Sequence, residues 1–241
     1  MAESYQTEDE QVEALKKWWK ENGKSTLLTI IVAIAAVFGY QGWEKQQQAE
    51  VDAASAIYQN LLTATGGQNG IATATQTATA NHLADTLKSD FPSSTYARFA
   101  ALYKAKLAVD AKDLTGAEQE LQWVLASGPS AEITLQAKLR LSRVLSAQGQ
   151  YDEALAQLQG DTGTYATAYE EAKGDIYVAQ GNNADAALAY QKALELEQQG
   201  TNPGSNPLLS LKIQQLATQA DAAVTPAEAT TATTDSTDKE A

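Results

Sequence analysis

The longest uninterrupted apolar stretch of the chain lies near its N-terminus. From Ser25 to Trp43 there are 19 residues without a charge, and most of those at the centre are Leu, Ile, Val, Ala and Phe. A helix of that length, at about 1.5 Å per residue, extends roughly 28 Å, close to the ~30 Å hydrocarbon core of a bilayer. Aromatic side chains, which favour membrane interfaces, flank both ends. The pattern predicts a transmembrane anchor over residues 25–43. The predicted membrane contacts are Trp18, Trp19, Leu27, Ile30, Ile31, Ile34, Phe38, Tyr40 and Trp43.

Three other interpretations of this stretch are a phosphate-binding loop, a signal peptide and a buried core helix. The phosphate-binding loop is disfavoured, because the position five residues before Gly23 is Trp18 and not the required glycine. A cleavable signal peptide would have an unusually long charged region, and its small-residue site would fall in the middle of the apolar run, at 33–35. The core helix remains the alternative to an anchor.

The lysine distribution predicts the orientation of the anchor. Four lysines lie between residues 16 and 24, whereas Lys45 is the only Lys or Arg between the span and Lys88. Cationic residues accumulate on the cytoplasmic side of a span. We therefore expect a single-pass inner-membrane protein with residues 1–24 in the cytoplasm and the bulk of the chain in the periplasm. Val12, Leu15 and the two tryptophans share one helical face, so residues 1–24 are predicted to be an amphipathic segment at the membrane interface.

After the anchor, apolar residues recur at helical spacing. The span is expected to continue outward as a helix to Ala64, where the glycine-rich stretch at 65–70 interrupts it. The Ala/Thr run at 72–80 predicts only weak helix, and Phe91-Pro92 predicts a helix end. The tail at 221–241 consists mainly of Ala, Thr and acidic residues and is predicted to be disordered.

A repeat occupies the region between the span and the tail. The segments that begin at Gly149 and Gly181 align 32 residues apart, and a weaker copy lies at 112–129. Here the chain resembles the tetratricopeptide repeat, a helix–turn–helix unit with small residues where its two helices cross. The best unit, 167–198, has Gly174 at the small position of its first helix. We therefore expect an all-α fold, with a repeat domain over 44–220; a non-repeat helical bundle is the alternative.

The stacking of such units explains further positions. A single unit cannot bury its apolar face, so at least three must stack. The segment 206–220 is expected to cap the stack with an apolar face made of Leu208, Leu209, Leu211 and Leu216. The resemblance also implies a binding surface on the first helices of the units, used for protein–protein contacts. Carried over by alignment, its residues are Phe99, Leu102, Lys106, Gln136, Leu139, Arg143, Glu171, Asp175 and Val178.

Composition narrows the function. The formal net charge is −13, which disfavours nucleic acid as a partner, and the chain has no cysteine. The only histidine, His82, lies in a polar segment without a neighbouring catalytic group, and the acidic pairs are adjacent residues that point apart on a helix. We therefore expect a protein that is not an enzyme and that needs no cofactor or metal.

The order of parts resembles the YfgM family of ancillary SecYEG translocon subunits. The resemblance is most specific in "EDEQVEALKKWWKENGK" at 8–24, and it extends to about residue 220. It implies a scaffold beside SecYEG and a PpiD-type membrane-anchored chaperone, where it links newly translocated, unfolded polypeptides to periplasmic chaperones. The alternative is a tether in another cell-envelope assembly, such as cell-wall or pilus biogenesis.

Overall fold

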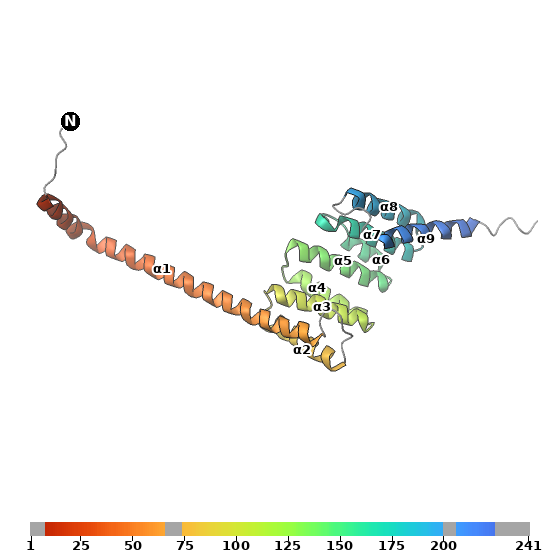
Figure 1. Cartoon of the computed structure of the whole chain (residues 1–241), viewed down its shortest axis with the longest axis horizontal. Helices are drawn as coiled ribbons and strands as arrows, with labels where there is room; N and C mark the ends of the chain where they lie inside the picture. The colour runs from red at the N-terminus through yellow and green to blue at the C-terminus, as the bar shows by residue number, and fades with distance from the viewer. Residues whose placement is uncertain (1–7, 66–73, 200–205, 225–241) are drawn as a thin grey trace, which may run out of the picture. The chain divides into compact units, whose positions relative to one another are not determined.

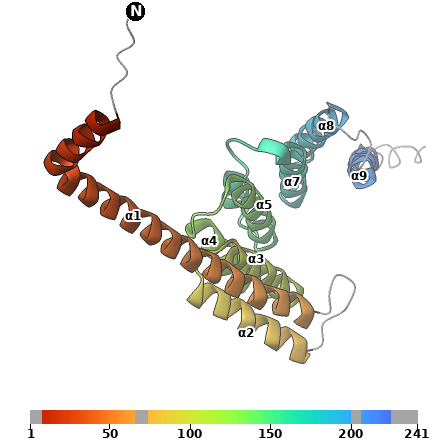
Figure 2. The same cartoon turned by 60° about the vertical axis from the view of Figure 1, so that its left-hand side comes forward.

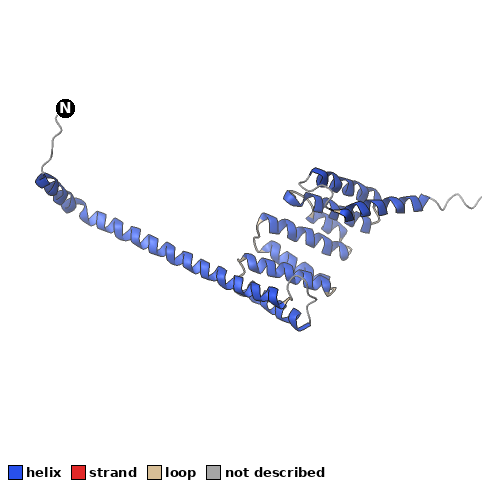
Figure 3. Ribbon diagram, in the orientation of Figure 1, coloured by secondary structure: helices blue, strands red, loops and turns tan. Residues whose placement is uncertain are grey.

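The computed structural model describes residues 8–65, 74–199 and 206–224, and every long element in these ranges is an α-helix (Figure 3). The expectation of an all-α fold is confirmed. The helices are α1 (Glu8–Ala64), α2 (Ala74–Asp90), α3 (Thr95–Asp110), α4 (Leu114–Ala126), α5 (Ala131–Ala147), α6 (Tyr151–Gln157), α7 (Ala166–Ala179), α8 (Asn183–Gln199) and α9 (Pro207–Val224), with one short 3-10 turn, η2 (Gly163–Tyr165). The chain forms two compact units, Met1–Ala56 and Ile57–Ala241.

The first unit consists of the N-terminal part of α1. This helix is long and apolar enough to span a membrane, and none of its most apolar window is buried against protein. It runs without interruption through the predicted boundary at residues 24 and 25. Figure 2 shows its first turns bent away from the rest of the helix. That end also contains Gly23, buried beneath the Trp19 ring, and Thr26, whose hydroxyl donates to the Asn22 carbonyl. Glycine and such hydroxyl-to-backbone bonds both favour bending.

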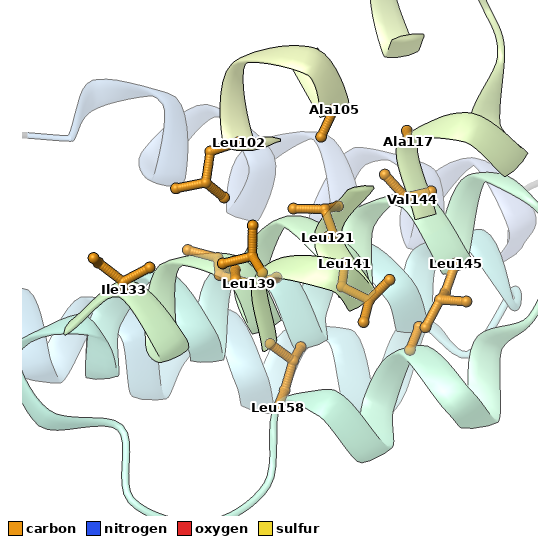
Figure 4. Packing of buried hydrophobic residues seen from close by; sticks show 14 of the residues in the cluster. Leu102, Ala105, Ala117, Leu121, Ile133, Leu139, Leu141, Val144, Leu145 and Leu158 are labelled. Carbon is orange, nitrogen blue, oxygen red and sulfur yellow. The ribbon is translucent and has the colours of Figure 1, made fainter. Parts of the chain in front are cut away.

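The second unit is a stack of helix pairs. Helices α3 and α4, α5 and α6, and α7 and α8 pack as antiparallel neighbours, and α2 packs on α3 while α9 packs on α8 (Figure 1). These pairs coincide with the three units predicted from the repeat. Leucines of α3, α4 and α5, and Leu158 directly after α6, pack together between the layers, as Figure 4 shows for Leu102, Leu121, Leu141 and Leu158. The core is therefore continuous from one pair to the next, as a stacked repeat requires.

Small residues set the helix crossings. A Cβ atom on Gly174 would overlap the ring of Tyr190, so α7 and α8 approach more closely there than any larger residue allows. Ala186 and Ala193 are fully buried on the same face of α8. At the equivalent position of the middle pair, Ser142 is fully buried and its hydroxyl donates to the Leu139 carbonyl at 2.9 Å. A serine is tolerated at this crossing because its one polar group is satisfied.

The middle pair departs from a regular repeat. Its second helix, α6, has only 7 residues, because the chain turns at Gly160, whose φ is +92°. The carboxylate of Asp161 then accepts from the Gly163 amide and starts the η2 turn. Asp161 replaces the last alanine of the repeat pattern, so the irregularity in sequence marks a real early helix end.

Three expectations for the ends of the domain need correction. The Ala/Thr run forms a regular helix from Ala74 onward, because Ala80, Ala84 and Leu87 of α2 are buried by packing. The predicted capping face is confirmed for two of its four leucines and wrong for the other two. Leu209 and Leu216 are buried, but Leu208 and Leu211 are 62% and 58% exposed, because they lie outside the buried face of α9. α9 also includes 221–224, the first residues of the predicted tail; the remainder, 225–241, and most of the glycine-rich stretch lie outside the described residues.

Candidate functional site

A groove of about 520 Å³ lies between the first helices of the first two repeats. We call it the α3–α5 groove. Its lining residues come from the end of α1, from α3, from α4 and from α5: Tyr58, Phe99, Leu102, Tyr103, Ala105, Lys106, Val109, Leu114, Leu121, Gln136, Arg140, Arg143, Val144 and Ala147. Most of them are apolar or aromatic. The groove is thus a concave, largely apolar surface with a few polar groups, which is the usual character of a ligand site.

Helix packing explains why the groove is open at this place. Helix α3 packs mainly on α4, and α4 packs on α5, whereas α5 also packs directly on α7. The two first helices, α3 and α5, therefore both pack on α4 and do not pack closely against each other. The buried side chains of Leu121 and Val144 form part of the lining at this opening.

Aromatic residues form one wall of the groove. The Tyr58 ring lies 6.1 Å from the Phe99 ring and 5.5 Å from the Tyr96 ring, measured between centroids. Burial raises the pKa of the Tyr58 hydroxyl, so this group stays neutral over the physiological range. Tyrosine and phenylalanine supply large apolar contact area with few rotamers to restrict on binding.

The charged groups of the groove are all cationic. Lys106 pairs with Asp110 of its own helix, Nζ to carboxylate oxygen at 2.8 Å, and both side chains are exposed. Arg140 and Arg143 have no ion pair among the described residues. Burial lowers the pKa of the Arg140 guanidinium, and the charge of Arg143 also lowers it, while Tyr165 opposes this change. No Asp or Glu is found among the described residues that line the groove.

The structure brings together five of the nine predicted protein-binding residues. Phe99, Leu102, Lys106, Gln136 and Arg143 all line the α3–α5 groove. Leu139 does not: it is 7% exposed and packs in the core of the repeat stack. Sequence alignment alone placed it on the surface, but its side chain turns inward at this register.

The remaining three predicted residues lie on α7, outside the groove. Glu171 and Asp175 bind Lys212 of α9, with Nζ at 2.7 Å from each carboxylate. Val178 is exposed near the end of α7. The two carboxylates are therefore engaged by the chain itself rather than presented as a free surface.

A polar cluster surrounds this α7–α9 contact. The Tyr190 hydroxyl donates to Asp175 at 2.7 Å, and Asn206 donates to Glu171 at 3.0 Å. On the neighbouring face, Glu170 accepts from Lys173 and Lys192. Burial disfavours the charge of Lys212, but hydrogen bonds to Asp175 and Glu171 outweigh it and raise the Lys212 pKa. The cluster fastens the last helix to the stack.

Sequence reasoning missed two important lining residues, Tyr58 and Arg140. Tyr58 precedes the repeats and belongs to the end of α1, so a repeat alignment could not include it. Arg140 lies three residues before Arg143 on α5 and shares its helical face, which is the one signal that could have indicated it. Among the described residues no group of three or more His, Asp or Glu side chains could hold a metal ion, and His82 is exposed on α2.

Comparison with known proteins decides the family. The tetratricopeptide repeat-like domain family matches residues 16–218. The chain is 33% identical over 202 residues to a protein of Haemophilus influenzae called "Ancillary SecYEG translocon subunit", covering 81% of this chain and 95% of the relative. Relatives with the same description from Escherichia coli and Neisseria gonorrhoeae are 29% and 30% identical, covering 89% and 87% of this chain and 98% and 97% of the relatives. The chain belongs to this family of ancillary translocon subunits.

Family membership confirms several expectations. The resemblance inferred from residues 8–24 and from the glycine-spaced repeat identified the right family and the right repeat class. It also confirms that the protein is not an enzyme, because the ancillary translocon subunits are a non-enzymatic family with a tetratricopeptide-like domain.

Proposed function

We propose that this protein is a membrane-anchored ancillary subunit of a SecYEG translocon. In this proposal, residues 1–24 lie on the cytoplasmic side, residues 25–43 span the inner membrane, and the repeat domain within 44–220 lies in the periplasm. The description of the relatives and the apolar N-terminal part of α1 support the proposal together. The lysine asymmetry around the span supports the orientation.

The repeat domain would act through protein–protein contacts. The observation that carries this step is the α3–α5 groove, which is concave and mainly apolar, and whose lining includes five residues that the repeat alignment had predicted. A groove of that kind suits extended or helical segments of other polypeptides. We propose that it contacts polypeptides newly translocated through SecYEG, or a PpiD-type membrane-anchored chaperone that receives them.

Photo-crosslinking in native membranes tests both parts of the proposal. A photoreactive amino acid would replace Ile34 in the predicted span or Gln136 in the groove. We expect Ile34 to crosslink to SecYEG subunits and Gln136 to emerging chains or to the chaperone. The matched control is a probe at Leu188, which is 64% exposed on α8 and does not line the groove.

Two results would contradict the proposal. Crosslinks from Ile34 only to cell-wall or pilus assembly proteins would make the protein a tether in another envelope machine. Equal crosslinking from Gln136 and Leu188 would show that the groove has no preferred role in protein contacts.

The orientation has its own test, helped by the absence of native cysteine. Single-cysteine variants Ala14→Cys and Leu188→Cys would be treated with a membrane-impermeant maleimide in intact spheroplasts. We expect labelling of Leu188→Cys only, and labelling of Ala14→Cys only after the membrane is disrupted. The reverse pattern would refute a cytoplasmic N-terminus.

A further inference from the structure

We propose that the α3–α5 groove selects acidic apolar segments, in which glutamate or aspartate side chains lie beside large apolar residues, through Arg140 and Arg143. The inference rests on the proposed function, because it names the class of polypeptide that the groove accepts. It concerns acidic side chains within a segment of another polypeptide.

The groove is cationic although the chain as a whole is acidic. The chain has a formal net charge of −13, yet the described lining of the groove contains two arginines and one lysine and no acid. Lys106 is already paired with Asp110, whereas Arg140 and Arg143 have no ion pair among the described residues. Arg140 is half-buried and Arg143 is exposed beside it. A half-buried guanidinium without a carboxylate is poorly solvated, so an incoming carboxylate would gain a charge-assisted, bidentate hydrogen bond at Arg140, and Arg143 would add a second positive charge.

The apolar part of the lining favours a segment with large apolar side chains over a free anion. The two arginines belong to α5, and the buried Leu121 and Val144 line the same groove. The aromatic pair Tyr58 and Phe99 lines it too. A free anion would use the arginines alone and leave this surface exposed to water. A segment with large apolar residues next to its acids would fill the groove and pair the arginines at the same time.

The opposite end of the same domain shows what such pairing looks like. There, Lys212 of α9 reaches the carboxylates of Glu171 and Asp175 on the first helix of the last repeat. One first helix of the stack, α7, therefore already binds another helix through ion pairs, with apolar packing of α9 beside them. In the α3–α5 groove the signs are reversed, and the described residues supply no carboxylate for Arg140 or Arg143.

The acidic tail of the chain is a weaker candidate for the occupant. Residues 225–241 contain Glu228, Asp235, Asp238 and Glu240, but they contain no Val, Leu, Ile, Met, Phe, Tyr or Trp. This tail could supply charge and could not fill an apolar groove. We therefore assign the groove to another polypeptide and treat the tail as an alternative that the experiment can detect.

The experiment measures peptide binding to the full chain in detergent micelles by fluorescence anisotropy. The probe is a labelled peptide blocked at both ends, with a Leu-Phe-Glu-Glu-Leu core, so that no terminal carboxylate is present. Two matched peptides replace both glutamates by glutamine, or replace the three apolar residues by serine. We expect the acidic apolar peptide to bind at least about tenfold more tightly than either control, the size expected for one charge-assisted pair.

The protein variants separate charge recognition from folding. Arg140→Gln with Arg143→Gln should lower the affinity for the acidic peptide about tenfold and leave that for the glutamine peptide within about twofold. Lys138→Gln, on the same helix but outside the lining, should change neither by more than about twofold. Circular dichroism of both variants checks that the helices remain folded.

Each other outcome overturns the inference in a distinct way. If the acidic and glutamine peptides bind equally and the double variant has no effect, the groove is apolar without charge selection, and the proposed function survives. If no peptide binds, but truncation after Val224 restores binding, the tail is the occupant. If the double variant instead converts a dimer to a monomer in light scattering, the occupant is a second copy. If none of the peptides binds under any condition, the ligand class is wrong, and the crosslinking experiment decides the proposed function separately.

Discussion

The two ends of the repeat domain use the same helix positions in opposite ways. Alignment to the repeat placed Lys106 and Arg143 of the first two units, and Glu171 and Asp175 of the last unit, on one continuous surface. At the α3–α5 groove, Arg140 and Arg143 have no ion pair among the described residues. At α7 the acids are bound by Lys212 of α9, and Gly174 and Tyr190 close the crossing beneath them.

The difference teaches that the neighbouring helix, and not the repeat position, decides whether a surface is free. A charged group that a following helix satisfies contributes to stability, whereas one that no helix satisfies is available for a partner. Stabilities in a stacked repeat are set locally, so changes at the two ends can be measured separately by hydrogen exchange. The predictions below use this separation.

The largest effect is expected at the α7–α8 crossing. Gly174→Val would force a branched side chain into the ring of Tyr190, whose hydroxyl is held by Asp175. We expect a loss of about 3 kcal/mol in the free energy of opening of α7 and α8, typical of overpacking, with amides of α3 and α4 unchanged. The control Ala179→Val, at an exposed position of α7, should change it by less than about 0.5 kcal/mol. A uniform loss over the whole domain would contradict local stability.

Removal of the Lys212 charge at the contact between α7 and α9 should cause the next largest loss of stability. Lys212→Met leaves Glu171 and Asp175 facing each other without a counter-charge. We expect the free energy of opening of α9, measured by amide hydrogen exchange, to fall by about 1 kcal/mol. This is the low end for charge-assisted hydrogen bonds, because the site is partly exposed. Lys192→Met is the matched control: it also loses a carboxylate contact, but its side chain is 61% exposed and should matter less. Equal effects of the two variants would refute a specific fastening of α9.

Acid should loosen the same end before it affects the groove. Burial raises the pKa of Glu170, but hydrogen bonds and charge from Lys173 and Lys192 outweigh burial and lower it below its ordinary value of 4.5. A carboxyl whose pKa is lowered on folding adds stability above its unfolded pKa, and that stability is lost as the pH falls through the folded pKa. We expect exchange of α7 and α8 amides to accelerate below about pH 4.5, and Glu170→Gln to weaken this acid dependence. The exposed Glu195→Gln serves as the control; an identical response in both variants would contradict the assignment.

The smallest change in stability is expected at the groove itself. This change distinguishes most clearly between a charge that supports the fold and a charge that is available to a partner. Arg140→Gln removes a half-buried cation that has no ion pair among the described residues. We expect the stability of α3 to α5 to stay within about 0.5 kcal/mol or to rise, in contrast to the loss caused by Lys212→Met. Thermal and urea unfolding followed by circular dichroism measures both. A clear destabilisation would show that Arg140 supports the fold rather than a partner.

The sequence by itself determined the helical content, the long apolar N-terminal helix and the repeat. These features depend on local periodicity and on small residues at fixed spacing, as Gly174, Ala186 and Ala193 show. The family was also readable, because residues 8–24 and the order of parts are specific. The alignment even placed five of the nine predicted contact residues in one groove.

Only the tertiary structure decided which of those residues are free. The inward turn of Leu139, the capture of Glu171 and Asp175 by Lys212, and the exposure of Leu208 and Leu211 all depend on how a helix rotates against its neighbour. The Ala/Thr run at 74–80 became regular helix because packing of Ala80 and Leu87 outweighs weak local propensity. Tyr58 lines the groove although it lies outside the repeats, for the same reason. Local periodicity determines which residues share a helical face. Packing between distant segments determines what that face contacts.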